Sequence, residues 1–135
     1  MKRALLVAAV LGLTAAAAPP AHAKEGVTAH LENRLSLKAK PGTTVRVTWS
    51  LYVLEHGEKR PFGASGLFVR ARGKGGTFAK AYDEGGTNNR YTARLKVPRG
   101  GLASIRFGLD GTRTMANGDS EYAPAYFPLD NDPFD

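Results

Sequence analysis

Basic side chains on the outward positions of predicted strands are the residues of this sequence whose types and spacing most clearly point to binding chemistry. Six of them alternate with apolar neighbours: Arg46, Arg70, Arg72, Arg94, Lys96 and Arg106. If their strands are neighbours, these side chains form a cationic sheet face that attracts an anionic cell-wall polymer or an acidic protein partner. The same pattern also serves solubility and protects sheet edges from pairing with other chains, and this alternative stays open.

Metal binding is the second chemistry that the residue types allow. Imidazole and thioether groups bind copper, and the candidate ligands are His30, His56 and Met115, which are scattered along the chain. Residues 130–135 offer oxygen atoms at alternating positions, as calcium prefers, but they lack the central glycine and the distal glutamate of an EF-hand.

Catalytic constellations are missing from the sequence. The chain has no cysteine, which excludes a disulfide scaffold, a thiolate metal site and a cysteine nucleophile. No serine lies in a Gly-x-Ser-x-Gly motif, since the stretch 63–66 is one residue too short. The glycine-rich stretch around Lys74 lacks the spacing of a phosphate-binding loop. We therefore expect a protein that is not an enzyme.

Strands must position these side chains, because the body of the chain alternates apolar and polar residues. The clearest case is 43–54, where Val45, Val47, Trp49, Leu51 and Val53 occupy one face. The same alternation covers 27–31, 67–72, 91–97 and 103–109, and weaker candidates are 34–38, 77–82 and 122–128. Clusters of glycine and proline separate these segments. Seven to eight strands predict an all-β, immunoglobulin-like antiparallel β-sandwich with Trp49 at its centre.

The N-terminus is typical of a secretory signal peptide. Lys2 and Arg3 precede an apolar run over 4–18, and Ala21-His22-Ala23 predicts cleavage after Ala23. The run is shorter than the roughly 20 residues that span a bilayer. We therefore expect a secreted, extracytoplasmic protein without a transmembrane anchor, for which nucleic acid is a disfavoured partner. The expected divisions are the signal peptide 1–23, the sandwich 24–117 and an acidic, aromatic C-terminal segment 118–135.

Charge is distributed unevenly between these divisions. The whole chain carries a net charge of +7, but residues 24–117 alone carry +10 and residues 118–135 carry −5. This asymmetry suggests that the acidic segment folds back on the basic body. Its aromatic residues would anchor it there: Tyr122, Tyr126, Phe127 and Phe134.

Several motifs together carry a family resemblance. They are Pro41-Gly42 before the Trp49 strand, Arg90-Tyr91-Thr92-Ala93 leading into Val97-Pro98, the stretch 104–109 and the late Tyr126-Phe127-Pro128. On these the chain resembles small exported bacterial immunoglobulin-like domains of the YtkA-like kind and, more distantly, CopC-like copper-handling proteins. The resemblance implies an exported β-sandwich, sometimes with copper at a histidine or histidine–methionine cluster. We expect a binding or structural module, with extracytoplasmic copper binding as the alternative.

Overall fold

The computed structural model describes residues 26–85 and 89–135, and the predicted signal peptide 1–23 lies outside the described residues. Within the described ranges the regular elements are β-strands, apart from the short 3₁₀ helix η2 (Lys74–Gly76), which confirms the predicted all-β sandwich of antiparallel sheets. The strands are β1 (Val27–Leu31), β2 (Thr44–Glu55), β3 (Glu58–Pro61), β4 (Leu67–Arg72), β5 (Phe78–Tyr82), β6 (Arg90–Lys96), β7 (Ser104–Leu109), β8 (Thr112–Thr114), β9 (Ser120–Tyr122) and β10 (Ala125–Phe127).

The first sheet is built around β2, the longest strand. β1 pairs antiparallel with β2 on one side, while β6 and β3 pair with successive parts of β2 on the other. Trp49 lies opposite Leu31 on β1 and Tyr91 on β6. The period-two alternation of β2 turns its apolar residues inward, as the sequence predicts.

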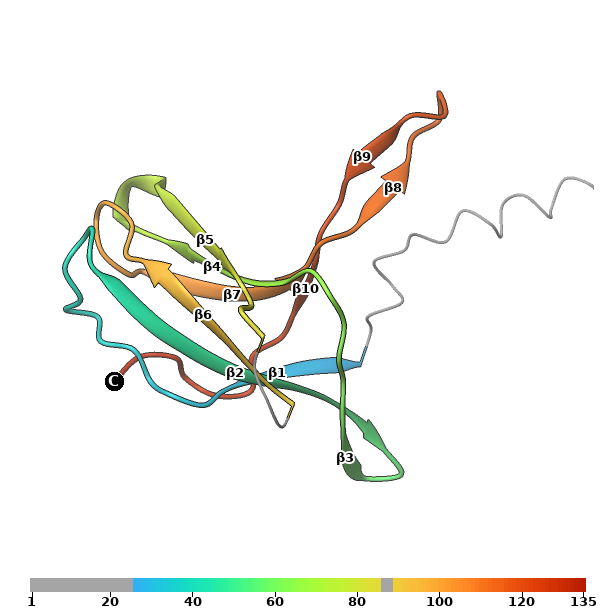
Figure 1. Ribbon diagram of the computed structural model, residues 1–135, viewed down its shortest axis with the longest axis horizontal. Coiled ribbons are helices and arrows are strands. Elements are labelled where there is room, and N and C mark those ends of the chain that lie inside the picture. Colours follow the sequence, from blue (N-terminus) through green and yellow to red (C-terminus); the bar gives the residue numbers. More distant parts are fainter. Residues whose placement is uncertain (1–25, 86–88) are drawn as a thin grey trace, which may run out of the picture.

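The second sheet has the strand order β10-β7-β4-β5, with every pair antiparallel. It packs over the first sheet, and Figure 1 shows the two layers with the β8–β9 hairpin projecting away from them. The ring of Trp49 is fully buried between the sheets, 4.9 Å from Phe107 and 6.0 Å from Tyr91 between ring centroids. This aromatic cluster is the centre of the core.

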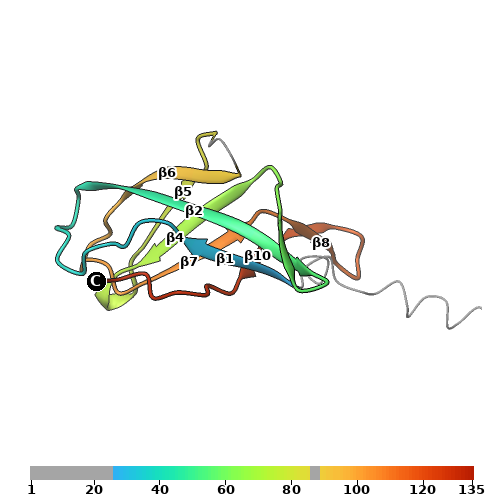
Figure 2. The same cartoon turned by 90° about the horizontal axis from the view of Figure 1, so that it is seen from below.

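Contacts between the sheets close both sides of the sandwich. On one side, the end of β5 meets β6, where the Glu84 N–H donates to the carbonyl of Thr92. On the other side, residues 128–130 run beside β1, with hydrogen bonds from the Ala29 N–H to Pro128 and from the Asp130 N–H to Ala29. Figure 2 shows the C-terminal segment following this side of the molecule. Residues 125–130 of the acidic segment thus belong to the two sheets, whereas β9 lies in the projecting hairpin.

Some details differ from the sequence-based expectation. Residues 34–38 are not a strand, and Leu35 makes an isolated bridge with Phe134 instead. The sequence does not predict the short strands β3, β8 and β9, because their residues are mostly exposed and show no apolar alternation. No described part of the chain forms a helix with the length and apolar character needed to cross a membrane.

Candidate functional site

The outer face of the second sheet carries a row of basic side chains. Arg106 on β7 lies opposite Arg70 on β4, and Arg70 lies opposite Lys80 on β5. Like charges directly opposite each other on neighbouring strands destabilise a sheet. A row of three cations therefore lowers the stability of the fold. Because an anionic ligand would offset this repulsion, the face is a candidate binding surface.

The next row places an aromatic ring against the arginines. Phe78 lies opposite Arg72, and the Arg70 guanidinium stacks 3.8 Å from the centroid of the Phe78 ring. Stacking orients the planar guanidinium while its N–H groups remain able to donate to a ligand. Together these side chains form what we call the arginine hollow, a depression of about 200 Å³ lined by Arg70, Ala71, Arg72, Phe78, Ser104 and Arg106.

The three arginines of this hollow differ from Lys80 in their partners. Among residues 26–85 and 89–135, none of the three has a carboxylate within ion-pair distance. Lys80 does, because its Nζ lies 3.4 Å from Asp110 and donates to the Tyr122 hydroxyl at 2.8 Å. Burial alone would lower the pKa of Lys80, but hydrogen bonds to Tyr122 and Tyr82 and the charge of Asp110 raise it above its ordinary value. Asp110 thus compensates the positive charge of Lys80, whereas the three arginines have no such carboxylate in the part of the chain that the structure describes.

An aromatic layer supports this face from the β10 side. Phe68 points outward on β4, as its phase predicts, yet it is fully buried between the rings of Tyr82 and Tyr126. Gly108 makes room for it, since a Cβ at this position would lie 2.6 Å from the Phe68 ring. Arg106 stacks on Tyr126 with 3.6 Å between the guanidinium carbon and the ring centroid. Arg106 therefore rests on a ring that is itself packed against the buried Phe68.

The remaining predicted basic residues belong to the first sheet. Arg46 and Arg94 lie opposite each other on β2 and β6, and Lys96 ends β6. Arg94 donates to both carboxylate oxygens of Glu84 at 3.1 and 3.2 Å. The six predicted residues thus lie on two outer faces, with Arg70, Arg72 and Arg106 together on one of them.

Sequence reasoning missed Phe78, Lys80 and the basic loop residue Arg99. Phe78 and Lys80 could have been found, because alternation along the predicted strand 77–82 places them on the same face as Tyr82. That strand contains few large apolar residues, so its pairing with β4 could not be predicted. Arg99 follows Pro98 in a turn, where periodicity gives no information about position.

The predicted copper ligands occupy separate elements. His30 is on β1, His56 is in the turn between β2 and β3, and Met115 is in the turn between β8 and β9. Figure 1 shows the β8–β9 turn at the upper right and the β2–β3 turn at the lower right, in separate projecting hairpins. Within residues 26–85 and 89–135 no three side chains of His, Asp or Glu gather as a metal site.

The C-terminal oxygen atoms considered for calcium already have protein partners. Asp130 lies 2.7 Å from the His30 ring through Oδ1 and accepts a hydrogen bond from the Tyr52 hydroxyl through Oδ2, also at 2.7 Å. The Asn131 amide bonds to the backbone N–H and carbonyl of Leu31. The Oδ1 atom of Asp132 accepts from the Phe134 N–H. The bonds of Asp130 and Asn131 attach the segment to β1 and β2.

No family model, curated protein or solved structure matches this chain. A function must therefore be argued from the residues and their geometry.

The Asp130 contacts predict a pH dependence of stability. Burial alone would raise the pKa of Asp130, but hydrogen bonds from Tyr52 and His30 and the charges of His30 and Lys59 outweigh it, and the pKa is lowered. A lowered folded-state pKa means that the stabilisation is present above the unfolded pKa of about 3.9 and is lost as the pH falls through the folded value.

We expect Asp130→Asn to lower the free energy of unfolding at pH 7 and to have a progressively smaller effect as the pH falls below about 4. Urea unfolding at a series of pH values, followed by circular dichroism, measures this difference. If the free energies of unfolding of the two proteins differ by the same amount from pH 7 to pH 2.5, the pKa of Asp130 is not lowered by folding.

Proposed function

We propose that this chain is an exported, non-enzymatic binding module that contacts anionic cell-envelope material through the arginine hollow. The observation that carries the proposal is the absence, within the described residues, of a carboxylate partner for Arg70, Arg72 and Arg106. The predicted signal peptide supports a place outside the cytoplasmic membrane, and the guanidinium groups of the hollow support the binding of anions.

Arginine suits this role because its planar guanidinium donates two parallel hydrogen bonds to a carboxylate or phosphate. Stacking on Phe78 and Tyr126 fixes two of the guanidinium groups before a ligand arrives, which reduces the entropy lost on binding. An anion in the hollow would also relieve the repulsion between Arg70 and Arg106, which lie directly opposite each other.

The chain contains a matched control for this proposal. Arg70 and Arg106 form a cross-strand arginine pair on the second sheet, and Arg46 and Arg94 form a similar pair on the first. The variants R70Q/R106Q and R46Q/R94Q therefore remove the same charge from different faces.

We expect R70Q/R106Q to reduce retention on purified anionic cell-wall material at least tenfold, since each charge-assisted contact contributes about 1.5–3 kcal/mol. R46Q/R94Q should bind within about twofold of the unmodified protein. Sedimentation of the protein with the insoluble material, at several salt concentrations, measures retention, which should weaken as salt rises. Equal losses in the two variants would indicate attraction by net charge alone and would overturn the proposal.

A further inference from the structure

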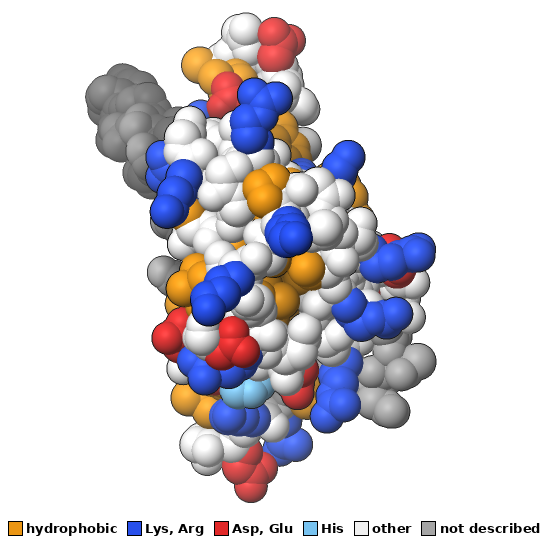
Figure 3. Space-filling view, turned by 90° about the vertical axis from the view of Figure 1, so that its left-hand side faces the viewer, with side chains coloured by type: hydrophobic (Ala, Val, Ile, Leu, Met, Phe, Trp, Pro, Cys, Tyr) orange, Lys and Arg blue, Asp and Glu red, His pale blue; other side chains and the backbone are white. Residues whose placement is uncertain are grey.

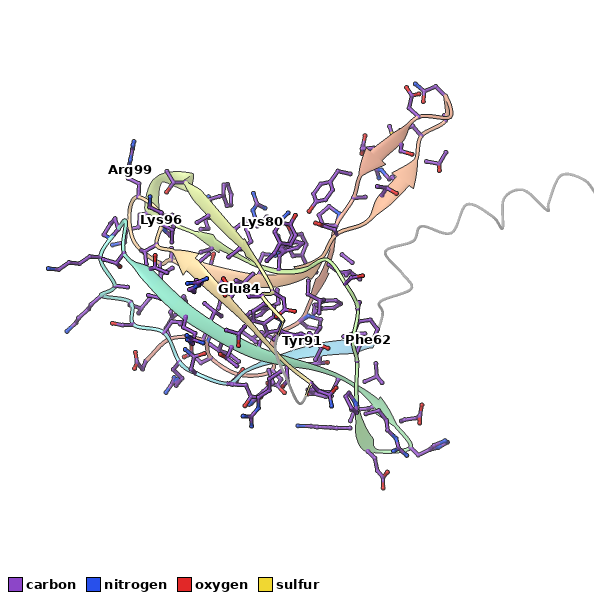
Figure 4. The ribbon with its side chains drawn as sticks, in the orientation of Figure 1. Phe62, Lys80, Glu84, Tyr91, Lys96 and Arg99 are labelled. Atoms are coloured by element: carbon purple, nitrogen blue, oxygen red, sulfur yellow. The ribbon has the colours of Figure 1, made fainter. Side chains whose placement is uncertain are left out.

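A second basic hollow adjoins the arginine hollow. It has a volume of about 450 Å³, and its lining includes Phe78, Lys96, Pro98 and Arg99. We call it the edge hollow, because it lies where β5 of the second sheet meets the end of β6 of the first. Figure 4 shows Lys96 and Arg99 projecting from the same end of the sandwich, and Figure 3 shows this end with Lys and Arg side chains around small apolar areas.

Phe78 belongs to the lining of both hollows. It is one of the large apolar side chains that stay exposed, with 52% of its surface accessible. Within residues 26–85 and 89–135, Lys96 and Arg99 have no carboxylate within ion-pair distance, like the arginines on the other side of the ring. An exposed aromatic ring thus separates two groups of uncompensated cations.

The backbone that carries the edge hollow is held firmly. The Val97 N–H donates to Thr43, and the Gly42 N–H donates to Val97, at 2.8 and 2.9 Å. The Thr77 hydroxyl donates to the carbonyl of Arg99. Gly100 has a φ of 92° and packs so closely on the backbone of Lys74 that a side chain has no space there. The hollow is therefore formed before any ligand binds.

The distance across both hollows exceeds the reach of one acidic group. Arg106 lies on β7 and Lys96 on β6, with β4 and β5 between them. Two strand spacings of about 4.8 Å separate β7 from β5, about 10 Å in all, and Lys96 lies beyond β5 on the other sheet. A ligand that uses both groups of cations must carry several acidic groups along its length.

Resting on the proposed function, we propose that the two hollows form one continuous groove for a linear anionic glycan, with acidic groups bound on both sides of Phe78 and an apolar sugar face packed against its ring. Such a glycan alternates acidic groups with flat apolar sugar faces. This order matches that of the groove, where Phe78 lies between the cations of the two hollows. The predicted export favours a glycan over nucleic acid. Phe68, the other phenylalanine on this sheet face, is fully buried and cannot stack on a base.

The test compares short and long galacturonic acid oligomers, of two units and of ten, by isothermal titration calorimetry and, for weak binding, by NMR shifts. The variant K96Q/R99Q removes the edge hollow cations. K59Q/R60Q, in the β2–β3 hairpin, removes one lysine and one arginine elsewhere and serves as the matched control.

We expect the unmodified protein to bind the ten-unit oligomer at least tenfold more tightly than the two-unit oligomer, because a second set of contacts on one ligand acts at high effective concentration. K96Q/R99Q should lose most of this gain while binding the two-unit oligomer unchanged. R70Q/R106Q should weaken binding of both oligomers, and K59Q/R60Q of neither.

Three outcomes would overturn this inference. Equal binding of the long oligomer by K96Q/R99Q and the unmodified protein would remove the edge hollow from the groove, and the proposed function would stand if the binding still required Arg70 and Arg106. Single-stranded DNA of equal charge that binds more tightly than the ten-unit oligomer would assign the groove to nucleic acid. Binding of neither oligomer, together with no effect of R70Q/R106Q on cell-wall retention, would reject the inference and the proposed function together.

Discussion

A chain that ends at Asn117 is expected to lose its cooperative thermal unfolding transition. Its missing residues include β10, which pairs with β7 and buries Phe127. They also include Leu129, which bridges to β1, and Phe134, which packs against the core beside Leu35. Loss of one buried phenylalanine side chain costs about 3–5 kcal/mol. Loss of a whole strand with it approaches the entire stability of a domain, about 5–15 kcal/mol.

Circular dichroism melting of the truncated and full chains measures this effect. A chain that ends at Asp132 is the control, because it keeps β10 and the bonds of Asp130 and Asn131 and removes Phe134 with its bridge to Leu35. This shorter deletion should lower the melting temperature while the transition stays cooperative. A cooperative transition for the chain ending at Asn117, within a few degrees of that of the full chain, would show that the acidic segment contributes little to the fold.

Replacement of Trp49 by alanine is expected to cost about 3–5 kcal/mol of unfolding free energy. The ring is fully buried and contacts Phe107 and Tyr91, so its removal leaves a cavity between the two sheets. Trp49→Phe should cost less than half as much. It keeps a ring in the core and removes the indole N–H, which is buried without a hydrogen-bond partner in the described structure.

Urea unfolding followed by far-ultraviolet circular dichroism measures both variants, since neither keeps the single tryptophan for fluorescence. Equal losses for Trp49→Ala and Trp49→Phe would mean that the indole N–H has a partner whose loss is costly. That result would contradict the packing described for the core.

The long strands could be predicted from the sequence, because each buries one face and therefore alternates with period two. β2 is the best case, since Val47, Trp49 and Leu51 are all buried. β3 could not be predicted, because all four of its residues are exposed and it forms only by pairing with the end of β2. Predictions of this kind depend on burial and fail where burial is absent.

The basic strand residues of the candidate site could be named from the sequence, but Phe78 and the arrangement of the site could not. Alternation correctly placed Arg46 and Arg70 on outward phases of their strands. It could not say that β2 and β4 belong to different sheets, since strand pairing depends on contacts far apart in the sequence. For the same reason it could not bring Phe78 to the arginines.

The bonds between β1 and the C-terminal segment also affect when each side of the sandwich can form during folding. His30 bonds to Asp130 and Arg34 to Phe134, each across 100 positions of the chain. Contacts this distant form only after residues 130–134 have been synthesised, and their loops are slow to close. Until residues 130–134 have been synthesised, the side of the sandwich beside β1 therefore lacks these bonds.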